Sequence, residues 1–353
     1  MGNFRTAKYD LLGNSIDDPN KRFNADDVAF APASVLGLGN WQYALSRFIS
    51  GTADCSVAIL GDSTTAGING GGVTAFGNAR ANSVPSFLLT ALRGAMPTLA
   101  DRISGDSRWG WAGSGTSIAN YDPTITASAN WEVGTPGGTG GNPYRNDTVE
   151  TSSIIFNMEL PFDTINVQYL ASVGGASFYI GSNLNRFARL VDSNAALGPV
   201  NAPTTTVPAG SRQIIITRTT TGASCSIFHV QARSSAQKRL EVWNWGVTGE
   251  TLAGWIATAN NFDKFNLIPI TPPNLTIIKL GINDAIAATS NANCLTRLTT
   301  LIDKLRLTGD VVLATFSALP ASTASLANQY AVLSSIRSLA QSYGLPLIDL
   351  NNA

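Results

Sequence analysis

Short runs of consecutive apolar residues recur along the chain, and each has the length of one β-strand. Strands in a parallel sheet are buried on both faces, so they lose the alternation of apolar and polar positions. The segments between the later runs have helical spacing, which is typical of βαβ units. The pattern therefore predicts a doubly wound α/β sheet of five parallel strands at CSVAIL (55–60), LEVWNW (240–245), LTIIKL (275–280), DVVLATF (310–316) and LPLIDL (345–350).

Several segments carry apolar residues at the intervals of an amphipathic helix. WQYALSRFI (41–49) precedes the first predicted strand. A second set runs from Leu295 to Leu305 before Gly309, and a third runs over residues 326–343 before Gly344. Because glycine readily adopts the left-handed backbone of a helix C-cap, we expect the last two helices to end at these glycines.

Residues 126–235, between the first and second predicted strands, follow a different pattern. They are rich in Gly, Thr, Ser and Asn, and short alternating runs such as Phe156, Met158 and Leu160 predict antiparallel strands. We interpret this segment as an inserted all-β sandwich domain. Residues 41–125 and 236–353 then form one discontinuous α/β domain. Residues 1–40 show no sustained period and are predicted to be an N-terminal arm, which could contact a second copy of the chain or another partner.

The balance of charge narrows the possible partners. The 353 residues include 23 Lys and Arg and 23 Asp and Glu, so the formal net charge is zero. Nucleic acid is not expected as a partner, because neutralising its phosphates requires a basic surface. We also expect no membrane partner, since no apolar run is long enough to cross a bilayer. The first residues lack the apolar segment of a secretory signal, so Sec export is not expected.

Cysteine and histidine are too sparse to suggest a metal centre. The sequence holds 3 Cys and 1 His. Cys55, Cys225 and Cys294 lie far apart without the spacing of metal ligands, and we interpret them as buried thiols. We therefore expect neither a metal nor another cofactor. His229 is the one candidate for a histidine general base.

The residues that follow the first predicted strands carry the chemistry. In an open α/β sheet, ligands bind at the carboxyl ends of the strands, and the first strand runs directly into GDSTTAG (61–67). Ser63 would be displayed there as a nucleophile, with its backbone N–H at the start of the next helix. Gly246 follows the second predicted strand and Asn283 follows the third. Their backbone N–H and side-chain amide would complete a three-donor oxyanion hole with the N–H of Ser63.

These blocks resemble the SGNH (GDSL-type) hydrolase family: GDS at 61–63, NWGVTG at 244–249 and GIND at 281–284, each after an apolar strand and in the family's order. The resemblance covers roughly residues 45–125 and 236–353. It implies a flavodoxin-like fold and a carboxylic ester hydrolase in which Ser63 is the nucleophile and Gly246 and Asn283 complete the oxyanion hole. GDS occurs again at 105–107, where the pattern shows no strand before it.

The family's last block, Asp-x-x-His after the fifth strand, has no counterpart, because the sequence reads NNA at 351–353. Three interpretations stay open. The 353 residues are a fragment, or His229 replaces the missing base, or the chain is a degenerate hydrolase that binds without cleaving. For His229 a simpler interpretation exists, in which it alternates with Cys225 and Ile227 on one face of a strand in the β insertion.

Other side chains are given binding or structural roles. Trp109 and Trp111, in the glycine-rich stretch RWGWAGSG, are predicted to stack on a sugar ring, although tryptophans beside strands often fill the core. Asp62 is expected to hold the turn around Ser63 by accepting backbone N–H bonds, and Asp284 to do the same after Asn283.

The substrate expectation comes from the resemblance. The β insertion is similar to the sandwich modules that accompany polysaccharide-acting SGNH enzymes, which implies an acylated carbohydrate or polysaccharide as substrate. We expect a serine esterase that removes O-acyl groups, most simply O-acetyl. The alternative is a catalytically silent, carbohydrate-binding structural component of a phage tail or another surface assembly. We expect a protein made in the cytoplasm that acts outside the cell or on a virion.

Overall fold

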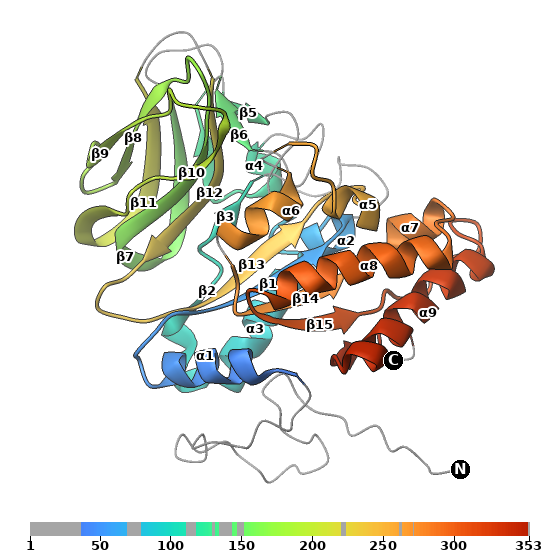
Figure 1. Cartoon of the computed structure of the whole chain (residues 1–353). Helices are drawn as coiled ribbons and strands as arrows, with labels where there is room; N and C mark the ends of the chain where they lie inside the picture. Colours follow the sequence, from blue (N-terminus) through green and yellow to red (C-terminus); the bar gives the residue numbers. More distant parts are fainter. Residues whose placement is uncertain are drawn as a thin grey trace.

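The computed structural model describes residues 37–68, 79–110, 118–128, 131–133, 143–146, 152–219, 224–260, 263–270 and 272–351. A six-stranded parallel sheet with the order β16-β15-β14-β1-β13-β2 lies in one half of the molecule (Figure 1). The predicted α/β class and its five strands are confirmed. The strands are β1 (Cys55–Gly61), β2 (Ile103–Ser104), β13 (Leu240–Gly246), β14 (Leu275–Lys279), β15 (Asp310–Ala314) and β16 (Leu347–Ile348).

The sixth strand, β2, was not predicted from the sequence. It is two residues long and pairs with the start of β13. It also precedes the second GDS, although Ile103–Ser104 is not a run of apolar residues like the predicted strands. A two-residue strand is too short to show any apolar periodicity.

The strand order places β1 at the centre of the sheet. The chain adds β13 on one side of β1 and β14 on the other, and β15 and β16 continue beyond β14. This is the doubly wound arrangement, in which the order reverses next to β1. The residues that follow β1 therefore lie at the point where such sheets bind their ligands.

Helices cover both faces of the parallel sheet. Within β1, Val57 and Ile59 belong to the apolar core shared with α1 and α3, whereas Ala58 and Leu60 belong to the core shared with α8 and α9. Figure 1 shows these helices on opposite sides of the strands. The longer helices are α1 (Gly39–Ile49), α3 (Val84–Ala95), α8 (Asn291–Arg306) and α9 (Leu326–Tyr343).

Shorter helices form mainly in the loops that leave the strands. They are α2 (Ser63–Ala66), η3 (Pro97–Arg102), α4 (Ile118–Tyr121), α5 (Leu252–Trp255), α6 (Lys264–Leu267), η4 (Ile268–Ile270) and α7 (Ile282–Ile286). No described helix is both long and apolar enough to span a membrane.

The two predicted glycine caps have different outcomes. Gly344 caps α9 in the left-handed conformation, with a φ of 62°, as predicted. The prediction for α8 was wrong, because this helix ends before Leu307, which caps it with a φ of −69°. Gly309 instead permits a close chain approach, since a Cβ there would lie 2.4 Å from the backbone oxygen of Pro273.

The second half of the molecule is an antiparallel β unit, drawn mainly in green at the upper left of Figure 1. Ten strands form one hydrogen-bonded sheet around a shared apolar core, and the 19-residue β7 and 14-residue β11 pair across register shifts near Ser211. The strands are β3 (Arg108–Trp109), β4 (Ile125–Ala127), β5 (Trp131–Val133), β6 (Tyr144–Asn146), β7 (Ser153–Ala171), β8 (Ser177–Ser182), β9 (Arg189–Asp192), β10 (Gly198–Asn201), β11 (Thr205–Arg218) and β12 (Cys225–Arg233).

A β-bulge in β12 changes the environment of His229. Cys225 and Ile227 face the core of the β unit, but the pairing with β7 shifts register between Ile227 and His229. Beyond the shift, Val230 faces that core. The expectation that His229 alternates with Cys225 and Ile227 on one face was therefore wrong. The extra residue turns the imidazole toward Trp109 and Trp243, where the two halves of the molecule meet.

Of the predicted N-terminal arm, residues 1–36 lie outside the described residues, and α1 begins at Gly39.

Candidate functional site

The predicted nucleophile lies on the turn between β1 and α2. Ser63 is the first residue of α2, and its side chain is partly exposed. Asp62 caps the helix: its Oδ1 accepts hydrogen bonds from the backbone N–H of Thr64 at 2.9 Å and from the Thr64 hydroxyl at 2.7 Å. The structural role expected for Asp62 is thus confirmed. The turn presents Ser63 at the carboxyl end of the central strand.

Gly246 lies beside this turn. It is the register partner of Gly61, so the last residues of β13 and β1 are direct neighbours. A Cβ on Gly246 would lie 2.4 Å from the backbone nitrogen of Ala66, which means that α2 packs directly against the glycine. In this structure the N–H of Gly246 donates to Oδ1 of Asn244 at 2.9 Å. The backbone N–H predicted to be an oxyanion donor is therefore bonded to a neighbouring side chain in this structure.

Asn283 lies on α7, after β14, and is linked to the loop that follows Gly246. Its Nδ2 donates to the backbone oxygen of Glu250 at 2.8 Å. The buried carboxylate of Asp284 accepts from the backbone N–H of Leu252 at 2.9 Å, so the expected structural role of Asp284 is confirmed. Burial raises the pKa of Asp284 above its usual value. These bonds bring the loops of Gly246 and Asn283 together at the same end of the sheet.

Sequence reasoning missed one charged side chain at this end of the sheet. Lys279 is the last residue of β14 and the register partner of Gly61. Its Nζ donates to the hydroxyl of Thr64 at 2.6 Å. Burial lowers the pKa of Lys279, while the charge of Asp62 acts in the opposite direction. The signal in the sequence was a lysine near the end of the apolar run LTIIKL, two residues before Gly281.

His229 is packed between aromatic rings. It is 2% exposed and stacks on Trp109 with a centroid separation of 3.7 Å and an interplanar angle of 10°. Burial lowers its pKa to about 3, so the imidazole is neutral at physiological pH. The structure thus favours a packing role for His229 over the role of substitute base.

Only one of the two tryptophans predicted to bind substrate, Trp109, is among the described residues. The indole of Trp109 is 5% exposed and lies between His229 and the rings of Trp243 and Trp245. Contact of Trp109 with a sugar stays a prediction. Trp111 lies outside the described residues.

The serine of the second GDS is buried. The Ser107 hydroxyl donates to Oε2 of Glu241 at 2.6 Å, and the same oxygen accepts from Nε2 of Gln231 and Nε1 of Trp243. Gln231 lies on β12 and Glu241 on β13, so this group of side chains joins the antiparallel sheet to the parallel sheet. Ser107 therefore holds the two halves of the molecule together.

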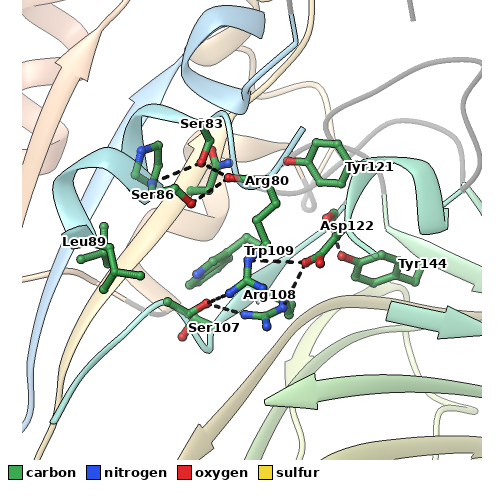
Figure 2. Close-up of a pocket in the computed structure, with 15 residues that line it drawn as sticks. Arg80, Ser83, Ser86, Leu89, Ser107, Arg108, Trp109, Tyr121, Asp122 and Tyr144 are labelled. Atoms are coloured by element: carbon green, nitrogen blue, oxygen red, sulfur yellow. Dashed lines mark hydrogen bonds and ion pairs between the residues drawn. The ribbon is translucent and has the colours of Figure 1, made fainter. Parts of the chain in front are cut away.

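A small polar cavity of about 40 Å³ lies beside these residues (Figure 2). Arg80 and Arg108 point toward Asp122, with nitrogen–oxygen separations of 3.6 and 3.2 Å, and Asn244 also lines the cavity. The volume suits a few water molecules and is far below that of a sugar. The arginines are compensated by buried carboxylates, so the cavity does not offer an open anion site.

The described residues contain no group of three or more His, Cys, Asp or Glu side chains that could hold a metal ion. The three cysteines are buried thiols, as predicted. Burial raises the pKa of Cys225 to about 12 and that of Cys294 to about 11, so neither is a thiolate at neutral pH.

Comparison with solved structures shows the fold. A peptidoglycan O-acetylesterase superposes with a TM-score of 0.60 at 17% identity, over 89% of this chain and 83% of that protein. A family two carbohydrate esterase from Clostridium thermocellum, in complex with cellohexaose, gives a TM-score of 0.24 at 12% identity over 64% of this chain and 88% of that protein. A two-domain esterase active on acetylated mannans gives 0.26 at 12% identity over 33% and 35%.

No protein-family model matches the sequence, and no curated protein matches it. The superposition on the peptidoglycan O-acetylesterase nevertheless shows that the chain shares the fold of that protein.

Proposed function

We propose, from the premise that this is an SGNH-type fold, that the chain is a serine esterase that removes O-acyl groups, most simply O-acetyl, from a carbohydrate or polysaccharide. The observation that carries the proposal is the meeting of three loops at the carboxyl end of the parallel sheet. Gly61 and Gly246 are register partners, and Asn283 is bonded to the loop after Gly246. Ser63 follows Gly61 by two residues, at the start of α2.

The proposed reaction uses these groups as follows. The Ser63 Oγ attacks the ester carbonyl carbon, and its proton passes to a general base, which in the family that the sequence resembles is a histidine. The carbonyl electron pair moves onto oxygen, where the N–H groups of Ser63 and Gly246 and the Asn283 amide donate hydrogen bonds. The carbon–oxygen bond to the sugar then breaks, and the sugar oxygen leaves with a proton. Water hydrolyses the acyl-serine and regenerates the hydroxyl.

The hydrogen bonds of the resting site are compatible with this role. An amide NH₂ has two donors, and the bond from Asn283 to the Glu250 oxygen uses one of them and fixes the orientation of the other. The N–H of Gly246 is bonded to the Asn244 side chain, so an oxyanion would have to displace Oδ1 of Asn244. Exchanging a neutral acceptor for an anionic one is favourable in a partly buried site.

The choice of an acylated carbohydrate is supported by a structural neighbour, a peptidoglycan O-acetylesterase that superposes over most of this chain. That superposition includes residues well beyond the parallel sheet, since it covers 89% of the chain. We therefore place the substrate among O-acetylated glycans, including peptidoglycan.

The test measures acetate release from p-nitrophenyl acetate and from O-acetylated peptidoglycan. Ser63→Ala is expected to reduce turnover by at least about a thousandfold, because it removes the nucleophile. Ser50→Ala is the control, because this exposed serine lies at the C-cap of α1 before β1 begins, and it is expected to keep turnover close to that of the parent chain. Full activity in Ser63→Ala would refute the nucleophile assignment.

The second candidate function is a silent glycan-binding component of a virion or surface assembly. The occupied N–H of Gly246 favours it, because a donor that stays bonded to Asn244 does not stabilise an oxyanion. The same experiment separates the two functions. Binding of the polysaccharide by the parent chain and by Ser63→Ala, with no acetate released by either, would establish the silent form.

A further inference from the structure

We propose that Lys279 is a positioning residue for the nucleophile, acting on the Ser63 turn through Thr64 and Asp62. This inference deepens the proposed esterase function and rests on it. The geometry is a chain of two hydrogen bonds that crosses from β14 to the turn after β1. Nζ of Lys279 donates to the Thr64 hydroxyl at 2.6 Å, and that hydroxyl donates to Oδ1 of Asp62 at 2.7 Å.

The two hydrogen bonds place the charge of Lys279 near the buried carboxylate of Asp62. Asp62 is 1% exposed, and its Oδ2 has no hydrogen-bond partner among the described residues. A buried carboxylate without a compensating charge is costly. The ammonium group of Lys279 supplies a positive charge close to this carboxylate. Through Thr64, it also fixes which oxygen of Asp62 faces the start of α2.

The bonds reach the nucleophile through the helix cap. Oδ1 of Asp62 accepts the backbone N–H of Thr64, the residue directly after Ser63. If the Asp62 side chain rotates, α2 loses this cap. Ser63 is the first residue of α2, so its hydroxyl and N–H both move with the turn. Because misplacing a reacting group by about 1 Å is enough to slow turnover by about a hundredfold, a residue outside the reacting set can control kcat.

The position of Lys279 in the sheet explains why this residue can reach the turn. Lys279 and Gly61 are register partners on adjacent parallel strands. A Cβ on Gly61 would lie 2.8 Å from the backbone oxygen of Lys279 and 2.0 Å from Oγ1 of Thr65. The glycine therefore allows α2 to lie close above the end of β14, where the four-carbon side chain of lysine spans the remaining gap.

The arrangement predicts an alkaline limit to activity. Lys279 carries its charge below its own pKa, which burial places lower than that of an ordinary lysine, and loses the charge as pH rises through that value. Asp62 is the charged group that acts on Lys279 among the described residues. Farther along the strand ends, Asp349 is paired with Arg337. Turnover should fall when Lys279 becomes neutral, because Asp62 then loses its compensating charge.

The experiment compares Lys279→Met and Lys279→Arg with the parent chain on p-nitrophenyl acetate from about pH 6 to about pH 10. Lys279→Met is expected to lower kcat about tenfold or more with KM within about twofold, and to remove the alkaline limit. Lys279→Arg is expected to retain more of kcat and to move the limit to higher pH, since arginine stays charged. Lys238→Met is the control and should match the parent, because Lys238 lies two residues before β13, at the amino ends of the strands and opposite the Ser63 turn.

Two outcomes overturn the inference while the esterase stands. One is a Lys279→Met variant with the kcat and pH profile of the parent. The other is an equal loss in the methionine and arginine variants together with an equal fall in melting temperature, which would indicate a structural role alone. Retention of full activity by Ser63→Ala would instead refute the proposed function.

A measurement that needs no activity tests the chain of bonds itself. In protein labelled with ¹³C-lysine, the Lys279 ε-carbon resonance is identified by its absence in Lys279→Met. We expect it to titrate at lower pH than the other lysines and to change its titration in Thr64→Val, which removes the hydroxyl but keeps the shape. An ordinary titration, unaffected by Thr64→Val, would overturn the inference whether or not the chain hydrolyses esters.

Discussion

Adding a single methyl group at Gly246 should disable the proposed esterase without unfolding it. The Cβ of Gly246→Ala would lie 2.4 Å from the backbone nitrogen of Ala66, 2.8 Å from its Cα and 2.9 Å from the carbonyl carbon of Thr65. All of these are backbone atoms of α2, so no flexible side chain can move aside. Either α2 or the end of β13 must shift, and α2 begins with Ser63.

The size of the effect follows from these distances. The shortest contact must open from 2.4 Å by about 1 Å to reach ordinary van der Waals separation. A displacement of about 1 Å at a reacting group costs about a hundredfold in rate. Loss of one oxyanion donor costs about 10²–10³ in kcat, or about 2.7–4 kcal/mol. We therefore expect kcat to fall at least about a hundredfold, while overpacking lowers the free energy of unfolding by about 1–3 kcal/mol.

The assay is kcat on p-nitrophenyl acetate, together with thermal unfolding followed by circular dichroism. Gly94→Ala in α3 is the matched control, because nothing lies within 4 Å of its added Cβ. It should keep its activity and gain up to about 1 kcal/mol of stability from the better helix propensity. A folded Gly246→Ala variant with kcat within about twofold of the parent would refute the idea that Gly246 and the Ser63 turn form one site.

Two further predictions concern residues outside the nucleophile turn. Arg337 holds the pKa of Asp349 below its usual value, so this ion pair stabilises the fold at neutral pH and loses that contribution as pH falls through the folded pKa. Both side chains are partly exposed, so Asp349→Asn should cost no more than about 1 kcal/mol near pH 7. Urea unfolding should show this difference disappear as pH falls through the lowered pKa of Asp349. Trp109→Ala should lower the free energy of unfolding by about 3–5 kcal/mol, because its buried indole stacks on His229. Unchanged unfolding combined with weaker polysaccharide binding would instead identify Trp109 as a ligand contact.

The sequence was sufficient to predict the parallel sheet, because strands buried on both faces leave a strong apolar signal. Cys55–Gly61 is buried throughout, and the other four predicted strands were also found. β2 was missed, since a two-residue strand is defined only by its pairing with β13. The cap of α8 was predicted wrongly because Gly309 serves a close approach of two backbones, which no local pattern reveals.

At the candidate site, side-chain roles that depend on a local motif could be predicted from the sequence, whereas those that depend on strand register could not. The roles of Asp62 and Asp284 could be predicted, because a carboxylate next to a turn accepts backbone N–H groups close by in sequence or at a neighbouring strand end. Lys279 could not, since its bond to Thr64 depends on the register of β14 against β1. The environment of His229 was mispredicted because one bulge reverses which side chains face the core.

One rung of the parallel sheet carries Gly61 at its centre, with Gly246 opposite on one side and Lys279 on the other. A slip of one residue in either neighbouring strand would reverse the facing of its side chains and separate the donor or the cation from the serine. Catalytic competence should therefore arise in an all-or-none manner late in folding. After dilution from denaturant, the recovery of turnover would then report when all the strands are aligned. Helix content, followed by circular dichroism, would recover earlier.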